Sequence, residues 1–120
     1  MSSRRKEWQE DTRLRLMRVV SQNPKATTRE IAQKIGISNG SAYYLLTSLI
    51  DKGLIKLSNF NNNSQKTIYL YFLTPKGIRE KSKLTHAFLI RKKKEYKLLK
   101  EELIELEQDV GIYKEECDEK

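Results

Sequence analysis

The stretch that decides the fold is TTREIAQKIGISNGSAYYLLTSLID, which occupies residues 27–51. Its first four residues, Thr27-Thr28-Arg29-Glu30, fit a capping box, in which a threonine hydroxyl accepts a hydrogen bond from a helix amide and the glutamate reaches back to the cap. Gly36 can adopt the left-handed conformation that ends a helix at little cost. Ser38 then caps a second helix. The stretch therefore predicts two helices joined by a tight turn.

The two predicted helices differ in the faces that they leave exposed. Apolar residues recur at helical offsets and predict the buried stripes, which are Ile31, Ala32 and Ile35 in the first helix and Ala42, Leu45, Leu46, Leu49 and Ile50 in the second. The outer face of the second helix carries hydroxyl, amide and phenol groups with almost no charge. Because Tyr43 and Tyr44 are adjacent, they cannot both face the core.

An amphipathic helix is predicted before this stretch, from about Glu7 to Gln22. Its apolar positions recur three and four residues apart, at Trp8, Leu14, Met17 and Val19 or Val20. Pro24 disfavours helical geometry in the residue before it, so we expect the helix to stop there.

Two strands are predicted after it. Leu54 to Phe60 alternates apolar and polar residues, and Thr67 to Leu73 is rich in β-branched and aromatic residues. The polar residues 61–66 between them tolerate left-handed conformations. We therefore expect an antiparallel hairpin.

A long helix is predicted from Pro75, where Thr74 is the cap and proline occupies the first helical position. No strong stop follows until about Tyr113. Positions alternate four and three residues apart along it, which is a heptad register: Ile78, Ser82, Thr85, Leu89, Lys92, Tyr96, Leu99, Leu103, Leu106, Val110 and Tyr113.

The order of elements is therefore helix, helix, tight turn, helix, two-stranded hairpin and long helix. This order predicts a mainly α protein with a small β-hairpin, which is a winged helix-turn-helix. We expect a winged domain over residues 1–74, and a long C-terminal coiled-coil dimerisation helix with an acidic tail over residues 75–120.

Residues 28–38, TREIAQKIGIS, and 49–55, LIDKGLI, resemble the MarR-type winged-helix repressors. The later segment FLTPKG, residues 72–77, resembles the small MarR-like regulators associated with exopolysaccharide gene clusters. The resemblance implies a DNA-binding transcription factor with its third helix in the major groove. Family members often carry Arg or Lys on that helix, whereas this chain has Tyr43, Tyr44 and Thr47. Specificity would then depend on hydroxyls, amides and contacts with thymine methyl groups.

Composition supports a polyanionic partner. The net charge is +8, and the distribution is uneven. Residues 1–100 contain 22 Lys and Arg against 7 Asp and Glu, whereas residues 101–120 contain 2 against 9. Such a field favours association with nucleic acid.

Other functional classes find little support in the sequence. No apolar stretch approaches the ~20 residues of a membrane span, and we expect a cytoplasmic protein. The single cysteine, Cys117, and the single histidine, His86, exclude an internal disulfide and a His/Cys zinc site. No catalytic constellation or phosphate-binding glycine loop is present, so we expect neither an enzyme nor a cofactor.

Two functions remain open, a regulator that binds double-stranded DNA and a protein-interaction adaptor on the same fold. For the regulator, contacts are expected on the two helix-turn-helix elements and at the tip of the hairpin. The predicted DNA-binding residues are Thr27, Thr28, Arg29, Ser38, Asn39, Ser41, Tyr43, Tyr44, Thr47, Asn62, Asn63 and Lys66. An effector ligand is neither indicated nor excluded.

A homodimer is expected because a helix from Pro75 to Tyr113 would be about 58 Å long, more than a small domain can cover. The predicted dimerisation residues are Leu89, Tyr96, Leu99, Leu103, Leu106, Val110 and Tyr113. The acidic tail would suit an antiparallel partner whose basic segment, residues 91–100, lies beside it. That order could hold the two domains farther apart than the ~34 Å between successive major-groove faces, so the order of pairing stays open.

Overall fold

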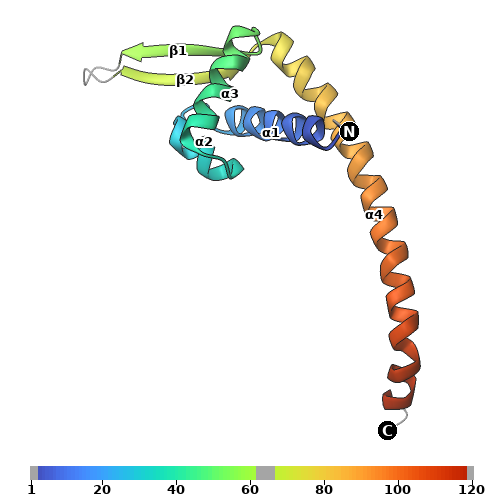
Figure 1. Ribbon diagram of the computed structural model, residues 1–120. Coiled ribbons are helices and arrows are strands. Elements are labelled where there is room, and N and C mark those ends of the chain that lie inside the picture. The colour runs from blue at the N-terminus through green and yellow to red at the C-terminus, as the bar shows by residue number, and fades with distance from the viewer. Residues whose placement is uncertain (1–2, 62–66, 119–120) are drawn as a thin grey trace. The chain divides into compact units, whose positions relative to one another are not determined.

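The computed structural model describes residues 3–61 and 67–118. Four helices and two strands follow one another in the predicted order: α1 (Ser3–Gln22), α2 (Thr28–Ile35), α3 (Asn39–Asp51), β1 (Ile55–Asn61), β2 (Thr67–Leu73) and α4 (Pro75–Asp118). Figure 1 shows α1 running beside the hairpin, α2 near the C-terminal end of α1, and α3 leading from there to the base of the hairpin. The winged helix-turn-helix and the long final helix are confirmed.

The element boundaries differ modestly from the sequence prediction. α1 begins at Ser3 rather than Glu7, β1 is shifted by one residue, and α4 continues to Asp118 rather than ending near Tyr113. The chain forms two compact units, of which the first ends at Thr85 and the second begins at His86. Among the described residues, no helix is both long enough and apolar enough to cross a membrane.

The core of the first unit lies between the three short helices and the start of the hairpin. Its largest fully buried side chains are Leu16, Met17 and Val20 of α1, Ile31 of α2, Leu46 and Leu49 of α3, and Ile55 of β1. The sequence pattern did not select Leu16, although this side chain is completely buried. α1 contacts both α2 and β2, so it buries a broader face than a single stripe.

Trp8 was predicted to face inward, and this is wrong, because 60% of its surface is exposed. Residues 4–9 of α1 are all exposed. The first turns of the helix therefore extend past the elements that bury its later part.

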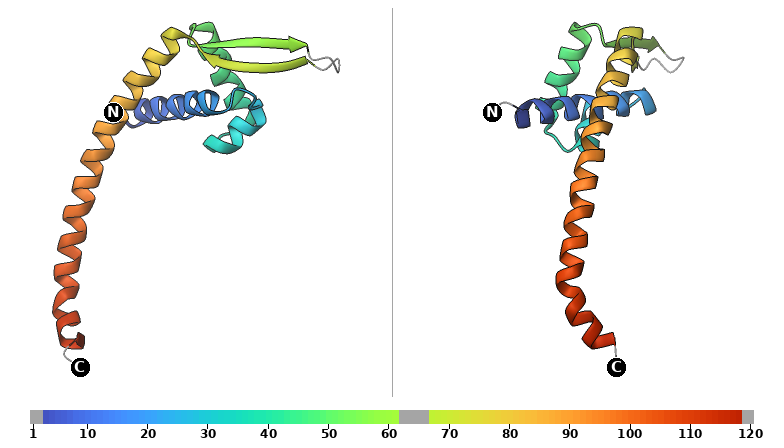
Figure 2. Two further views of the ribbon diagram at one scale, coloured as in Figure 1. Left: turned by 180° about the vertical axis from the view of Figure 1, so that it is seen from behind. Right: turned by 90° about the vertical axis from the view of Figure 1, so that its right-hand side faces the viewer.

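The predicted alternation of β1 also fails in part. Leu54 and Ile55 are both buried, although they are adjacent, whereas Leu57 is exposed. The strands pair antiparallel from Ile55 opposite Leu73 to Asn61 opposite Thr67. The end of the hairpin that leads into its loop lies clear of the helices (Figure 2). The core therefore reaches only the first residues of β1.

The hairpin is fixed at its base by backbone hydrogen bonds to the neighbouring loops. The Tyr71 amide donates to the carbonyl of Pro24 (3.0 Å), and the Thr74 amide donates to the carbonyl of Leu54 (3.0 Å). The first bond attaches the outer edge of β2 to the turn that follows α1. The wing therefore has a fixed origin on the helical core.

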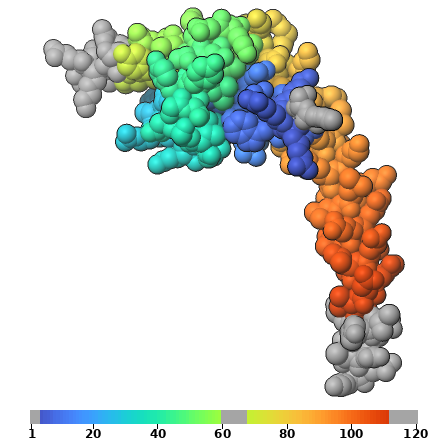
Figure 3. All heavy atoms as spheres, viewed as in Figure 1, coloured from blue at the N-terminus to red at the C-terminus, as the bar shows by residue number. Residues whose placement is uncertain are grey.

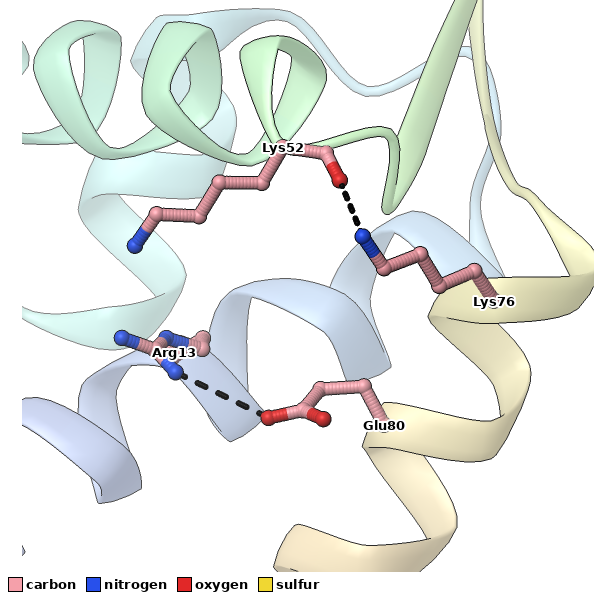
Figure 4. Close-up of polar contacts among 4 residues, drawn as sticks. All are labelled: Arg13, Lys52, Lys76 and Glu80. Carbon is pink, nitrogen blue, oxygen red and sulfur yellow. Dashed lines mark hydrogen bonds and ion pairs between the residues drawn. The ribbon is translucent and has the colours of Figure 1, made fainter.

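The start of α4 is attached to the end of α3. The Thr74 hydroxyl donates to the carbonyl of Gly53 (2.6 Å) and accepts from the amide of Gly77 (2.9 Å), so it caps the helix as predicted. The Lys76 ammonium donates to the carbonyl of Lys52 (3.0 Å), as Figure 4 shows. In the same view, Arg13 of α1 lies 3.7 Å from Glu80 of α4.

Gly77 lets α4 approach the α3–β1 connection closely. A Cβ atom at this position would collide with the backbone carbonyl of Leu54, which cannot move without displacing the hydrogen-bonded base of the hairpin. The constraint is steric, because it comes from neighbouring backbone and not from the conformation of Gly77 itself.

We expect Gly77→Ala to lower the free energy of unfolding by about 1 to 3 kcal/mol, as overpacking of a closed site does. Gly40→Ala is the matched control, since Gly40 lies in the first turn of α3 and an added Cβ would meet nothing within 4 Å. Chemical denaturation at one protein concentration measures both. Equal stability of the two variants would contradict the proposed contact.

Candidate nucleic-acid interface

The turn between α2 and α3 sets the direction of α3. Gly36 ends α2 in the left-handed conformation, with a φ of 75°. The amides of Gly36 and Ile37 both donate to the carbonyl of Ala32, at 2.9 and 3.0 Å. Ser38 then caps α3, since its hydroxyl accepts from the amide of Ser41 (3.1 Å). The predicted caps on either side of the turn are therefore both present.

One face of α3 is fixed in the core, and the other is open. Ala42, Leu46 and Leu49 are buried, whereas Leu45 and Ile50 are partly covered. Asn39 and Ser41 are exposed on the other face. Figure 3 shows α3 uncovered across the near face of the first unit.

Tyr43 and Tyr44 are the largest side chains on the open face. They are 63% and 77% exposed, so both point away from the core. The prediction that they do not both face the core is confirmed. Each can offer a phenol hydroxyl and an apolar ring edge to a partner.

Thr47 is more constrained than its neighbours. Its side chain is partly covered, and its hydroxyl donates to the carbonyls of Tyr43 and Tyr44, both at 3.0 Å. This bond commits the hydroxyl hydrogen to the helix backbone. Thr47 can therefore offer an oxygen lone pair or its methyl group, but not a donor, while this bond persists.

Two other predicted contact residues also serve as helix caps. The Thr27 hydroxyl accepts from the amide of Glu30 (3.1 Å), and the Glu30 carboxylate accepts from the amide of Thr27 (3.3 Å). The Ser38 hydroxyl donates to the Ser41 hydroxyl (2.9 Å) while it caps α3. Their primary role in the fold is therefore to orient α2 and α3.

Exposed basic side chains lie on the segments that precede and follow α3 in the chain. Arg29 is exposed in the first turn of α2, next to the partly covered Thr28. Four further cations are exposed on nearby segments of the chain and were not among the predicted contact residues: Lys25, Lys34, Lys52 and Lys56. Of the acidic residues in this part of the chain, Glu30 is bound to its cap. The surface therefore favours an anionic partner.

The remaining predicted DNA contacts, Asn62, Asn63 and Lys66, lie outside the described residues. The strands on either side bring both ends of this loop to the far end of the hairpin. Along the hairpin, Tyr69 and Phe72 of β2 are exposed, at 53% and 39%.

The predicted dimerisation residues on α4 are exposed from Leu89 to Val110, and the side chain of Tyr113 lies outside the described set. The heptad pattern missed three large apolar residues that are exposed on the same part of α4: Ile90, Leu98 and Ile104. Within the described ranges, no group of three or more His, Cys, Asp or Glu side chains could hold a metal ion.

A family model described as winged helix-turn-helix DNA-binding matches residues 9–56. This range includes the later part of α1 and all of α2 and α3, and it ends inside β1. No curated protein matches the sequence.

Solved structures give broader similarities. A PadR-like transcriptional regulator from Bacillus cereus is 19% identical with a TM-score of 0.63, over 72% of this chain and 89% of that chain. A mutant of ZitR from Lactococcus lactis in apo form is 26% identical with a TM-score of 0.57, over 89% and 82%. Wild-type ZitR in complex with DNA is 25% identical with a TM-score of 0.52, over 72% of this chain and 58% of that one.

ZitR is a zinc-responsive MarR family member. This chain thus has a winged helix-turn-helix fold that is similar in structure to transcriptional regulators of the MarR and PadR families. The resemblance to regulators associated with exopolysaccharide gene clusters is not supported by them.

Proposed function

We propose that this protein is a transcriptional regulator that binds double-stranded DNA sequence-specifically as a homodimer. The observation that carries the proposal is the open face of α3, where uncharged hydrogen-bonding side chains stand within a basic surface. Cations attract the phosphate backbone irrespective of sequence, whereas hydroxyl, amide and phenol groups can distinguish base edges.

α3 would lie in the major groove, which admits an α-helix. Its exposed N-terminal residues would approach the base edges, as in other helix-turn-helix proteins. Asn39 can pair with adenine through its carboxamide, and the rings of Tyr43 and Tyr44 can contact thymine methyl groups. Thr47, whose hydroxyl hydrogen is bound to the backbone, would contribute its methyl group or an oxygen acceptor.

α2 would fix the register on the phosphate backbone. The first amides of a helix have no partner within the helix, and the helix dipole attracts an anion there. The cap occupies the amide of Glu30, which leaves the earlier amides of the first turn for a phosphate. The exposed Arg29 guanidinium stands at the same end and would strengthen that contact.

The wing would contact the flanking backbone or minor groove through Asn62, Asn63 and Lys66. A dimer with two-fold symmetry would bind an inverted repeat, with one half-site for each α3. Occupation of such a site within a promoter would exclude the transcription machinery, so we assign the protein the role of a repressor.

The dimer would form through α4. From Leu89 to Val110 its apolar side chains are exposed, although a soluble protein rarely leaves a contiguous apolar stripe open to water. The heptad spacing of the stripe selects a helix as its partner.

The decisive experiment is a gel shift on the promoter of the protein's own operon with random competitor DNA. We expect Tyr43→Ala to lower the discrimination between operator and random DNA by about 1 to 3 kcal/mol, the size of one lost base contact. Tyr69→Ala is the matched control, because Tyr69 is similarly exposed but lies on β2. Unchanged discrimination in Tyr43→Ala would refute its role, and failure of the parent to prefer any promoter sequence would favour a protein-interaction adaptor.

Replacement of Arg29 should lower the affinity for all DNA sequences to a similar extent. We expect Arg29→Ala to weaken binding to operator DNA and to random DNA by similar factors. It should also reduce the slope of log affinity against log salt concentration by about 0.9. Lys83→Ala is the control, since Lys83 is an exposed cation on α4 and not on the helix-turn-helix. Fluorescence anisotropy over a salt series measures both slopes. Equal slopes for the two variants would show that Arg29 makes no phosphate contact.

The dimer is tested by sedimentation of the full chain and of a chain that ends at Lys97. We expect a full-length dimer at micromolar concentration and a monomeric truncation, because the truncation removes the apolar residues from Leu98 onward. The truncated chain should bind a single half-site, and much more weakly. A full-length monomer, or a truncation that remains dimeric, would refute assembly through α4.

A further inference from the structure

The direction in which two α4 helices would pair can be read from the charges that flank the apolar stripe. α4 is continuous from Pro75 to Asp118, so a single heptad register can be followed along it. Leu89, Tyr96, Leu103 and Val110 occupy position a. Lys92, Leu99 and Leu106 occupy position d.

Positions a and d form the seam of a coiled coil, and the residues that flank this seam separate by charge. Position g, immediately before each a residue from Tyr96 onward, holds Glu95, Glu102 and Asp109. Position e, immediately after each d residue, holds Lys93, Lys100 and Glu107. All six side chains are exposed. In a coiled coil these two positions set the orientation of the partner helix.

An antiparallel pair would place g beside g and e beside e of the second copy. All three g residues are acidic, so every contact on that side would be repulsive in any register. On the e side, where position 114 is also lysine, the lysines would gain an opposite charge only where one of them met Glu107. The flanks therefore disfavour antiparallel order.

A parallel pair would place each g residue beside the e residue five positions farther along the second copy. Glu95 would then meet Lys100, and Asp109 would meet position 114, which is lysine in the sequence. Glu102 would meet Glu107, the one repulsive pair among these three. Opposite charges therefore predominate in parallel order.

The seam begins near Tyr96. Lys92 would stand in the seam at a d position, but its ammonium donates to the Glu95 carboxylate of the same helix (3.1 Å). The same ammonium lies 5.3 Å from the centre of the Phe88 ring. Lys92 is thus engaged on its own helix, and the uninterrupted apolar positions start one step later.

We infer that α4 pairs in parallel with α4 of a second copy, through a seam that begins at Tyr96 and includes Leu99, Leu103, Leu106 and Val110. The inference rests on the homodimer proposed above and specifies its geometry. Each winged domain is attached to the N-terminal end of its α4, so parallel order brings both domains to the same end of the coil. This removes the conflict between long overlapping helices and the ~34 Å spacing of half-sites.

Parallel order also separates the acidic ends from the DNA. Residues 101–120 hold 9 Asp and Glu against 2 Lys. In parallel order both acidic ends lie at the end of the coil opposite to the two winged domains. The repulsion between these ends and the phosphates is then smallest, because screened interactions decay over about 8 to 10 Å.

Disulfide formation between full-length chains tests the order directly. Leu99→Cys and Leu106→Cys are made separately with Cys117→Ser, and Glu101→Cys with Cys117→Ser is the control that faces away from the seam. Parallel order predicts that both seam variants form covalent dimers on oxidation and that the control does not. An antiparallel coil cannot bring both seam residues to their own counterparts. A covalent dimer from one of them alone, from neither, or only from a mixture of the two would overturn the inference.

The repulsive pair supplies a second test, measured by sedimentation of the full chain. Glu107→Lys converts the contact of Glu102 with Glu107 into an attractive one in parallel order, so we expect dimer dissociation constants about 3- to 10-fold lower. Glu105→Lys makes the same charge change away from the seam and should give a smaller change. A dimer weakened by Glu107→Lys, or stabilised equally by both, would overturn parallel order while the homodimer itself stands. A monomeric parent chain would overturn both, and operator binding would still be judged by the gel shift.

Discussion

The close approach of α4 to the backbone at Leu54 is the constraint on which the first unit depends. Gly77 permits it, because any side chain there would collide with the Leu54 carbonyl. That carbonyl also accepts the Thr74 amide. The bonds from Thr74 to Gly53 and from Lys76 to Lys52 join the end of α3 to the start of α4 over the same few residues. The end of α3, the base of the hairpin and the first turn of α4 are therefore joined at a single junction within this unit.

Some polar side chains in this unit hold the backbone in place, and others remain exposed on the open face of α3. The hydroxyls of Thr27, Ser38 and Thr74 accept hydrogen bonds from amides in the first turns of α2, α3 and α4. The Thr47 hydroxyl donates to the backbone of α3. The side chains that remain on the open face are then large and weakly charged. A rigid scaffold thus presents an adaptable surface, which is the usual arrangement for recognition.

Charge is arranged along the chain as well as across the surface. The winged domain and the first part of α4 are basic, and the acidic residues gather beyond residue 100. A uniform field would attract DNA to all parts of the molecule. Segregation places the positive charge in the part of the chain that carries α3, where we propose that DNA binds, and the negative charge beyond residue 100.

Local signals in the sequence were sufficient for the element order. The capping box at Thr27, the left-handed Gly36, the Ser38 cap and the Thr74-Pro75 start each act over a few residues, and each lies where it was expected. The outward position of Tyr43 and Tyr44 follows from the apolar stripe of the same helix. These features depend on backbone geometry and helical periodicity, which neighbouring residues determine among themselves.

The tertiary structure decided how far burial extends. Trp8 and Leu57 have apolar side chains in suitable positions, yet both are exposed because the described elements do not cover the first turns of α1 or this part of the hairpin. Leu16 is buried because α1 contacts elements on more than one side. The function of Gly77 was equally invisible in the sequence, since its collision partner lies more than twenty residues away. Periodicity identifies which side of an element is apolar, but only the packing of distant segments determines where that side is covered.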